Sequence, residues 1–143
     1  MKILAIQAKN LVTVLVGLFL ICASGVANAA ATVGECNKQI DAVQTVLGPV
    51  TITSKNADQT KAGLAKKLTG AKNKLDKGKF FDARQKLVDF YSKVDELHSA
   101  RKPKIDLQDH DALIDAVNIA IACVDCLINP GNPSCTQFCP SPP

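Results

Sequence analysis

Aromatic side chains are scarce in this 143-residue chain, which has no tryptophan, one tyrosine and five phenylalanines. Sugar-binding modules stack their ligands on exposed aromatic rings, and proteins that hold single-stranded nucleic acid do the same with bases. The lysines of the chain are also not accompanied by an arginine cluster. A lectin-like role and nucleic-acid binding are therefore both disfavoured.

Recognisable catalytic motifs are missing as well. The only histidines are His98 and His110, and no Ser or Cys nucleophile is spaced to join them in a known arrangement. The acidic stretch DLQDHD (residues 106–111) lacks the glycine turn and the closing glutamate of an EF-hand calcium loop. We therefore expect no enzymatic activity, no catalytic residues and no cofactor, and we expect the two histidines to lie near one another at a helix–helix junction.

One long apolar run is present, and it lies at the N-terminus. Lys2 and Lys9 precede an apolar stretch at residues 11–23, and the small-residue pattern ANA ends at Ala29. This order predicts a secretory signal peptide over residues 1–29, and an uncleaved membrane anchor is the alternative. The run is short for the ~20 residues of a membrane span, and no other stretch is comparably apolar. We expect an exported, periplasmic or extracellular protein without a membrane span after signal cleavage.

Charge is distributed unevenly along the predicted mature chain of about 114 residues, which is one domain's worth. Without the two lysines of the signal, 17 basic residues become 15 against 13 acidic ones, a net charge of +2. Residues 55–79 hold eight lysines and two aspartates, whereas residues 106–125 hold five aspartates and no lysine or arginine. A lysine face could bind a polyanion; alternatively, these are solvated faces of electrostatically compatible neighbouring helices. The candidate residues for a polyanion face are Lys66, Lys67, Lys72 and Lys74.

Apolar residues recur at helical spacings of three and four through the rest of the chain. The third and most regular of these patterns consists of Phe80, Ala83, Leu87, Phe90, Val94 and Leu97. Four helices are predicted, at about residues 33–47, 57–77, 80–100 and 107–127.

Local signals mark the ends of these helices. Gly48 and Pro49 end the first one, and Gly78 is placed as the C-terminal stop of the second. Asn56, with Gln59 three residues on, suggests a capping box, and Asp106 is the expected N-cap of the fourth helix.

Short connections between amphipathic helices favour an all-α, up-down bundle of four helices over residues 30–128. The alternative is three packed helices with the first one lying loosely beside them. We expect a polar loop at VTITSKN (residues 50–56) and an irregular Pro/Cys-rich tail over residues 129–143.

From about residue 60 to 128 the chain resembles the FIMAH domain family, a small all-helical module of bacterial secreted and surface proteins. The positions that carry the resemblance are Leu64, Lys67, Leu68, Ala71, Leu75, Gly78, Ala83, Leu87, Phe90, Val94, Leu113 and Ile114. Lys79 and Pro103 depart from the family pattern, and the first helix and the tail are additions. The resemblance implies a three-helix core, an exported protein and an accessory role without catalytic residues.

Five cysteines remain after removal of the signal peptide: Cys36, Cys123, Cys126, Cys135 and Cys139. Thiols pair in the oxidising compartments outside the cytosol, so two disulfides and one odd cysteine are expected. In an up-down bundle the first helix starts at the pole where the fourth one ends. We therefore predict Cys36–Cys123, with Cys126 bonded to Cys135 or Cys139.

A second pairing scheme nests Cys123–Cys139 around Cys126–Cys135 and leaves Cys36 free. In either scheme the odd cysteine could link two copies of the chain into a dimer.

The spacing C-x2-C-x8-C-x3-C of the last four cysteines allows two other chemistries. Cys123, Cys126, Cys135 and Cys139 could close a tetrahedral zinc site. The C-x-x-C pair could instead be redox-active, but reactive thiols gain acidity at helix N-termini, and this pair lies at a predicted C-terminus beside Asp125.

The sequence as a whole predicts an exported, disulfide-stapled helical module that binds an unknown protein or envelope polymer. A polyanion or envelope-surface binder that uses the lysine-rich second helix is the first alternative. A structural zinc protein is the second.

Overall fold

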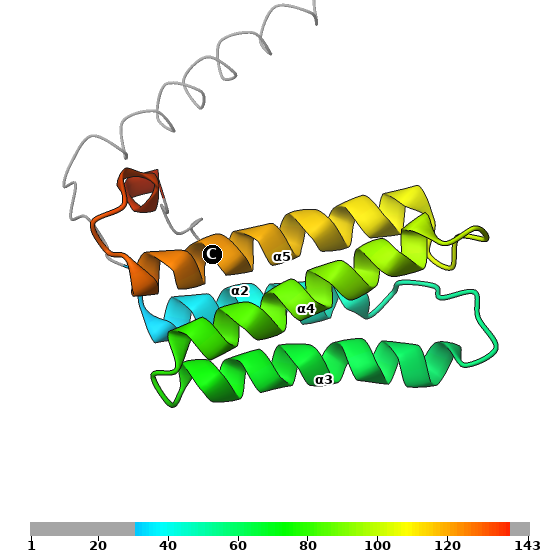
Figure 1. The fold of residues 1–143 in the computed structure, drawn as a ribbon, viewed down its shortest axis with the longest axis horizontal. Coiled ribbons are helices and arrows are strands. Elements are labelled where there is room, and N and C mark those ends of the chain that lie inside the picture. Colours follow the sequence, from blue (N-terminus) through cyan, green and yellow to red (C-terminus); the bar gives the residue numbers. More distant parts are fainter. Residues whose placement is uncertain (1–30, 138–143) are drawn as a thin grey trace, which may run out of the picture.

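The computed structural model describes residues 31–137, so the predicted signal peptide lies outside it. Its helices are α2 (Val33–Leu47), α3 (Ala57–Leu75), α4 (Phe80–Ser99), α5 (Leu107–Ile128) and the short 3₁₀ helix η2 (Pro133–Gln137) (Figure 1). Over this range there are no strands, and no helix is long and apolar enough to cross a membrane. The predicted all-α class and the four long helices are confirmed.

The four long helices form a closed up-down bundle (Figure 1). Helix α3 packs between α2 and α4, and α5 packs against the other sides of the same two helices. Because α2 contacts both of its neighbours and buries Cys36, Ile40 and Val43 completely, the alternative of a loosely attached first helix is wrong.

The core is made by the apolar stripes that the sequence predicts. Each helix contributes a face of residues spaced by three and four, which is what a straight helix needs to bury one side. Phe90 is the largest of the fully buried side chains, and Leu68, Leu87 and Leu113 are also completely buried. The described residues contain no buried polar or charged residue, so apolar burial supplies the cohesion of the bundle.

The turn between α3 and α4 fixes these two helices as an antiparallel hairpin. Gly78 has a φ of +66°, a left-handed conformation that glycine adopts without steric cost. The amide of Lys79 donates to the carbonyl of Lys74, and that of Gly78 donates to Leu75. These two bonds form a Schellman motif. Gly78 is thus the C-terminal stop that was predicted, and the regular part of α3 ends at Leu75, two residues before the predicted end.

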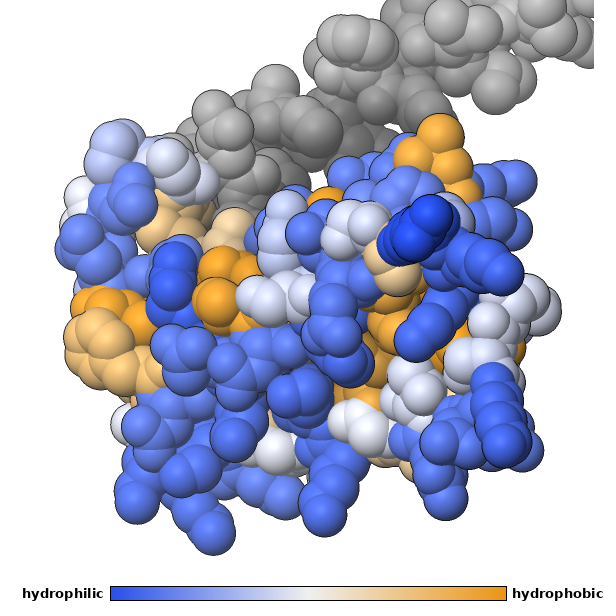
Figure 2. Space-filling view, turned by 45° about the vertical axis from the view of Figure 1, so that its right-hand side comes forward, coloured by the Kyte–Doolittle hydropathy of each residue, from blue (hydrophilic) through white to orange (hydrophobic). Residues whose placement is uncertain are grey.

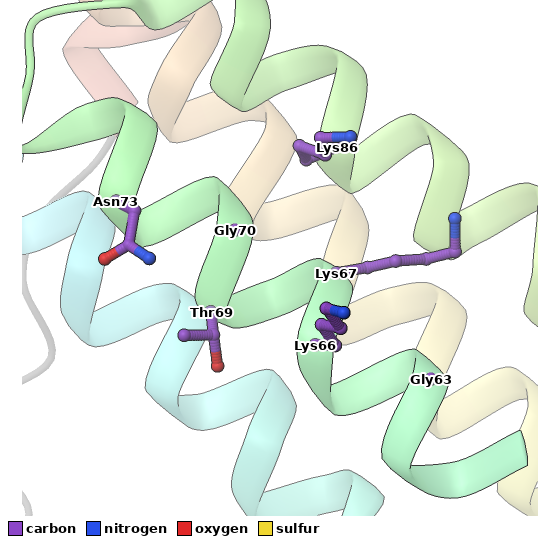
Figure 3. Close-up of a pocket in the computed structure, with 7 residues that line it drawn as sticks. All are labelled: Gly63, Lys66, Lys67, Thr69, Gly70, Asn73 and Lys86. Carbon is purple, nitrogen blue, oxygen red and sulfur yellow. The ribbon is translucent and has the colours of Figure 1, made fainter. Parts of the chain in front are cut away.

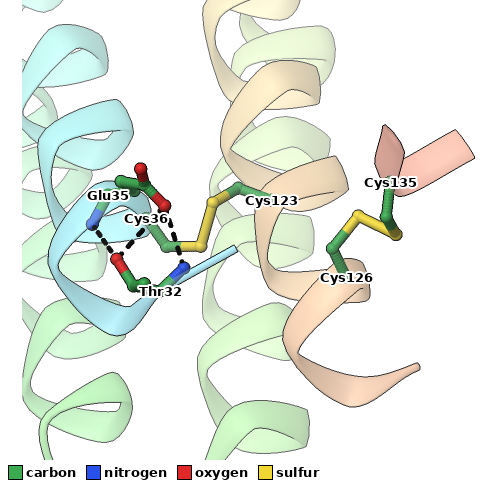
Figure 4. The surroundings of a disulfide bond; sticks show 6 residues. All are labelled: Thr32, Glu35, Cys36, Cys123, Cys126 and Cys135. Carbon is green, nitrogen blue, oxygen red and sulfur yellow. Dashed lines mark hydrogen bonds between the residues drawn. A yellow bond between two sulfur atoms is a disulfide. The ribbon is translucent and has the colours of Figure 1, made fainter. Parts of the chain in front are cut away.

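The N-caps of the helices agree with the sequence prediction at α5 but not at α3. Asp106 caps α5 as predicted, because its side chain accepts a hydrogen bond from the amide of Asp109. Asn56 precedes α3 but makes no side-chain cap, so the predicted capping box there is wrong. A complete capping box lies instead at α2, where Thr32 and Glu35 each accept a hydrogen bond from the other's amide (Figure 4).

The loop between α2 and α3 is not the polar segment that was expected. Val50 and Ile52 are buried, and they alternate with exposed threonines, so the segment behaves like one face of a strand. The amide of Thr53 donates to the carbonyl of Lys104, which ties this loop to the α4–α5 connection, where Ile105 is also buried. The two loops together close one end of the bundle.

The tail also departs from expectation. Residues 129–132 form a turn, but η2 follows it, so the tail is not irregular throughout. Pro133 occupies the first position of η2, where a missing amide donor costs nothing.

Candidate binding surface

Two disulfides fasten the pole at which α2 begins and α5 ends (Figure 4). Cys36 bonds Cys123, and Cys126 bonds Cys135, each with a Cα–Cα distance of 5.5 Å. The first is the pairing that the bundle geometry predicts, and the nested scheme with Cys36 free is wrong. Cys139 and its state lie outside the described residues. Paired cysteines of this kind indicate maturation in an oxidising environment.

The disulfides also bear on the two other cysteine chemistries. Zinc is ligated by thiolates, and Cys123, Cys126 and Cys135 already share their sulfur atoms with disulfide partners. Residues 31–137 contain no group of three or more His, Cys, Asp or Glu side chains arranged to hold a metal ion. The two cysteines of the C-x-x-C pair bond different partners rather than each other, unlike those of a redox-active pair.

Helical periodicity did not predict the burial of Cys126. Its position lies off the apolar stripe of α5, yet only 5% of its surface is exposed. The bond to Cys135 draws η2 over the end of α5, and burial follows from this disulfide rather than from the bundle core.

The predicted lysine face divides into two pairs with different surroundings. Lys72 forms an ion pair with Asp41 of α2, and Lys74 forms one with Asp82 of α4 at 2.8 Å. These two lysines therefore connect α3 to its neighbours. Lys66 and Lys67 form no ion pair with any residue in the described range.

A groove of about 510 Å³ lies over the outer face of α3 where it meets α4 (Figure 3). Three lysines, two glycines and two small polar residues line it: Gly63, Lys66, Lys67, Thr69, Gly70, Asn73 and Lys86. No carboxylate is among them, so the groove carries three positive charges without a counter-charge in its lining.

Lys86 is the lysine that sequence reasoning missed. It belongs to α4, but its side chain reaches the α3 groove, and its stem passes within 4 Å of the position a Cβ atom would have on Gly70. The antiparallel hairpin around Gly78 places the two segments side by side, because residues equally distant from a turn meet across it. Gly70 and Lys86 are each eight residues from Gly78, so the sequence could have predicted that they meet.

The placement of α5 keeps its aspartates away from the lysines of the groove. The aspartate-rich α5 lies diagonally across the bundle from α3, with α2 and α4 between them (Figure 1). The interpretation of the two charged helices as neighbours is therefore wrong. The space-filling view shows that the lower part of the molecule, where α3 lies, is mostly hydrophilic (Figure 2).

The aspartates at the start of α5 serve local structure. Asp106 caps the helix, and Asp109 accepts a hydrogen bond from the amide of Thr51 in the α2–α3 loop at 3.1 Å. Asp111 lies 2.9 Å from Nδ1 of His110. Each of these carboxylates therefore has a structural partner.

His98 and His110 lie together, as expected from their helix ends. Their rings stack with centroids 4.3 Å apart, and Nδ1 of His98 lies 3.2 Å from the carbonyl oxygen of Ile105. Nε2 of His110 lies 3.6 Å from a carboxylate oxygen of Asp95. This arrangement joins the end of α4 to the start of α5.

Comparison of the chain with protein-family models, with curated proteins and with solved structures finds no match. The FIMAH resemblance therefore stays a prediction from the residues quoted above.

Proposed function

We propose that this chain is an exported, non-enzymatic binding module that uses the α3–α4 groove to hold an acidic ligand. One observation carries the proposal: Lys66, Lys67 and Lys86 share a groove whose lining has no carboxylate. An anionic ligand in the groove would be attracted by all three ammonium groups, and no carboxylate of the lining would repel it.

Export to the periplasm or the cell exterior is part of the same proposal. The basic start, the apolar run and the small residues up to Ala29 support a cleaved signal peptide. The two disulfides agree with an oxidising destination. The accessory role implied by the FIMAH resemblance fits a small module that attaches another protein to an acidic envelope surface.

Retention of the exported, oxidised chain on immobilised heparin tests the binding site. We expect the wild-type protein to be retained and to elute with salt, because counterions released on binding make the interaction salt-dependent. Charge reversal of Lys66, Lys67 and Lys86 to glutamate is expected to abolish retention.

The matched control reverses three exposed lysines outside the groove: Lys38, Lys55 and Lys102. Both triple variants change the net charge by the same amount. Elution of the control variant at nearly the wild-type salt concentration would support the groove as the binding site. Equal loss in both variants would show that retention follows net charge alone and would overturn the proposal, as would failure of the wild-type protein to bind.

A further inference from the structure

Two glycines lie inside α3, at positions 63 and 70. Glycine disfavours a helix interior more than any residue except proline, because it loses the most backbone freedom on folding. A helix that carries two of them is less stable than the same helix with alanines.

Nothing within the described structure requires glycine at these positions. A Cβ atom on Gly63 would have no neighbour within 4 Å, and one on Gly70 would lie 3.8 Å from the stem of Lys86, an ordinary contact distance. Neither glycine has a left-handed φ; among the described residues only Gly78 does. Alanine would therefore fit at both sites, and neither helix packing nor backbone geometry accounts for the glycines.

Both glycines line the lysine groove (Figure 3). They are seven positions apart, so they lie on the same face about 10 Å from each other along the helix axis. Lys66 and Lys67 lie between them in sequence, and Lys86 approaches from α4. On this face the side-chain layer is missing only at Gly63 and Gly70, and the side chains of Lys66 and Lys67 stand between these two positions.

The lining also bears on the shape of the ligand. It contains no aromatic side chain on which a sugar ring or a base could stack. Thr69 and Asn73 supply hydroxyl and amide groups, and the lysines are compact point charges that suit phosphate oxygens.

We propose, building on the proposed function, that the groove holds a slender, acyclic phosphate polymer that lies along α3 over Gly63 and Gly70. Lys66, Lys67 and Lys86 contact its phosphates, and the missing Cβ atoms give the chain access to the helix surface. Inorganic polyphosphate and a polyol phosphate polymer share this chemistry.

Calorimetric titration of the oxidised, exported chain with inorganic polyphosphate, with poly(glycerol phosphate) and with heparin tests this inference. We expect both phosphate polymers to bind more tightly than heparin at equal salt, and the tighter of the two identifies the source of the ligand. Heparin binding as tight as theirs would overturn the preference for an acyclic chain.

Gly63→Leu and Gly70→Leu fill the groove without changing its charge. We expect each substitution to weaken polyphosphate binding about tenfold or more, because the ligand chain then meets a side chain. Gly34→Leu is the matched control, since Gly34 is an exposed helical glycine of α2 outside the groove. This variant is expected to bind polyphosphate as tightly as the wild-type protein.

A stability measurement separates a ligand-fitting role from a structural one. The double variant Gly63→Ala, Gly70→Ala is expected to raise the midpoint of thermal unfolding while weakening binding. A lower midpoint would assign the glycines to packing and overturn the inference. Full binding by the leucine variants, together with loss of binding on lysine charge reversal, would overturn the inference and leave the proposed function standing.

Discussion

Lysines of one helix have three different roles in this molecule. Lys61 donates to the carbonyl oxygens of Gly48 and Val50 and so closes the C-terminal end of α2. Lys74 pairs with Asp82 across the hairpin, whereas Lys66 points into the groove without a partner in the described range. The side-chain chemistry of the three lysines is the same. Their roles differ because different parts of the chain face them.

The ion pair between Lys74 and Asp82 leads to a prediction about the pKa of Asp82. The hydrogen bond and the positive charge of Lys74 hold the pKa of Asp82 below its ordinary value, with weaker help from Lys79 and Lys86. A depressed carboxyl pKa stabilises the folded state above the ordinary pKa, and this contribution is lost as pH falls through the lowered value. Lys74→Met is expected to move the pKa of Asp82 back up, as measured by carboxyl-carbon NMR titration.

Lys66→Met serves as the control for that titration. Lys66 is not among the groups that shift Asp82, so its removal is expected to leave the titration unchanged. An Asp82 titration that is the same in Lys74→Met as in the wild-type protein would contradict the assignment.

At the scale of elements, the α3–α4 hairpin organises both the fold and the groove. Its turn depends on Gly78, whose left-handed backbone allows the amides of Gly78 and Lys79 to satisfy the last carbonyls of α3. The same turn sets the register in which Lys86 reaches α3.

Gly78→Ala is expected to destabilise the protein by about 1 to 2 kcal/mol, the cost of a side chain in the left-handed region. A Cβ at this position would meet nothing within 4 Å, so the effect isolates backbone conformation from crowding. Urea unfolding measures it as a lower midpoint with an unchanged slope. Gly34→Ala, in an ordinary helical conformation, is expected to be neutral or stabilising, and equal destabilisation by both changes would refute the turn's role.

At the scale of the whole molecule, the Cys36–Cys123 disulfide joins the first and last long helices across 87 residues of sequence. The Cys126–Cys135 disulfide joins two cysteines that are nine positions apart and so closes a short loop at the tail. Chain-entropy estimates grow with loop length, so the two bonds restrict the unfolded chain to different extents.

Removal of each disulfide by paired Cys→Ala substitution is expected to follow this order. Loss of Cys36–Cys123 should lower the free energy of unfolding by about 4 to 5 kcal/mol, against about 2.5 kcal/mol for Cys126–Cys135. Guanidinium unfolding of the two double variants provides the comparison. A larger loss from the tail disulfide would show that native packing of η2, and not loop closure, determines the contributions.

The sequence alone determined the helices, because the spacing of three and four in stripes such as Leu87, Phe90 and Val94 is a local property of the chain. It also determined the cap at Asp106 and the turn at Gly78, which depend on the preferences of single residues. The cross-bundle disulfide followed from the up-down order and the placement of Cys36 near one end of it.

Only the tertiary structure decided which side chains remain unpartnered. The loop residues Val50 and Ile52 are buried because two distant loops meet, and Cys126 is buried because a disulfide draws the tail over it. Within the described range, Lys66 and Lys67 have no ion-pair partner, and the diagonal placement of α3 and α5 keeps the α5 aspartates away from the groove. Charge pairing acts over a few ångströms in space, and a sequence specifies such distances only through its fold.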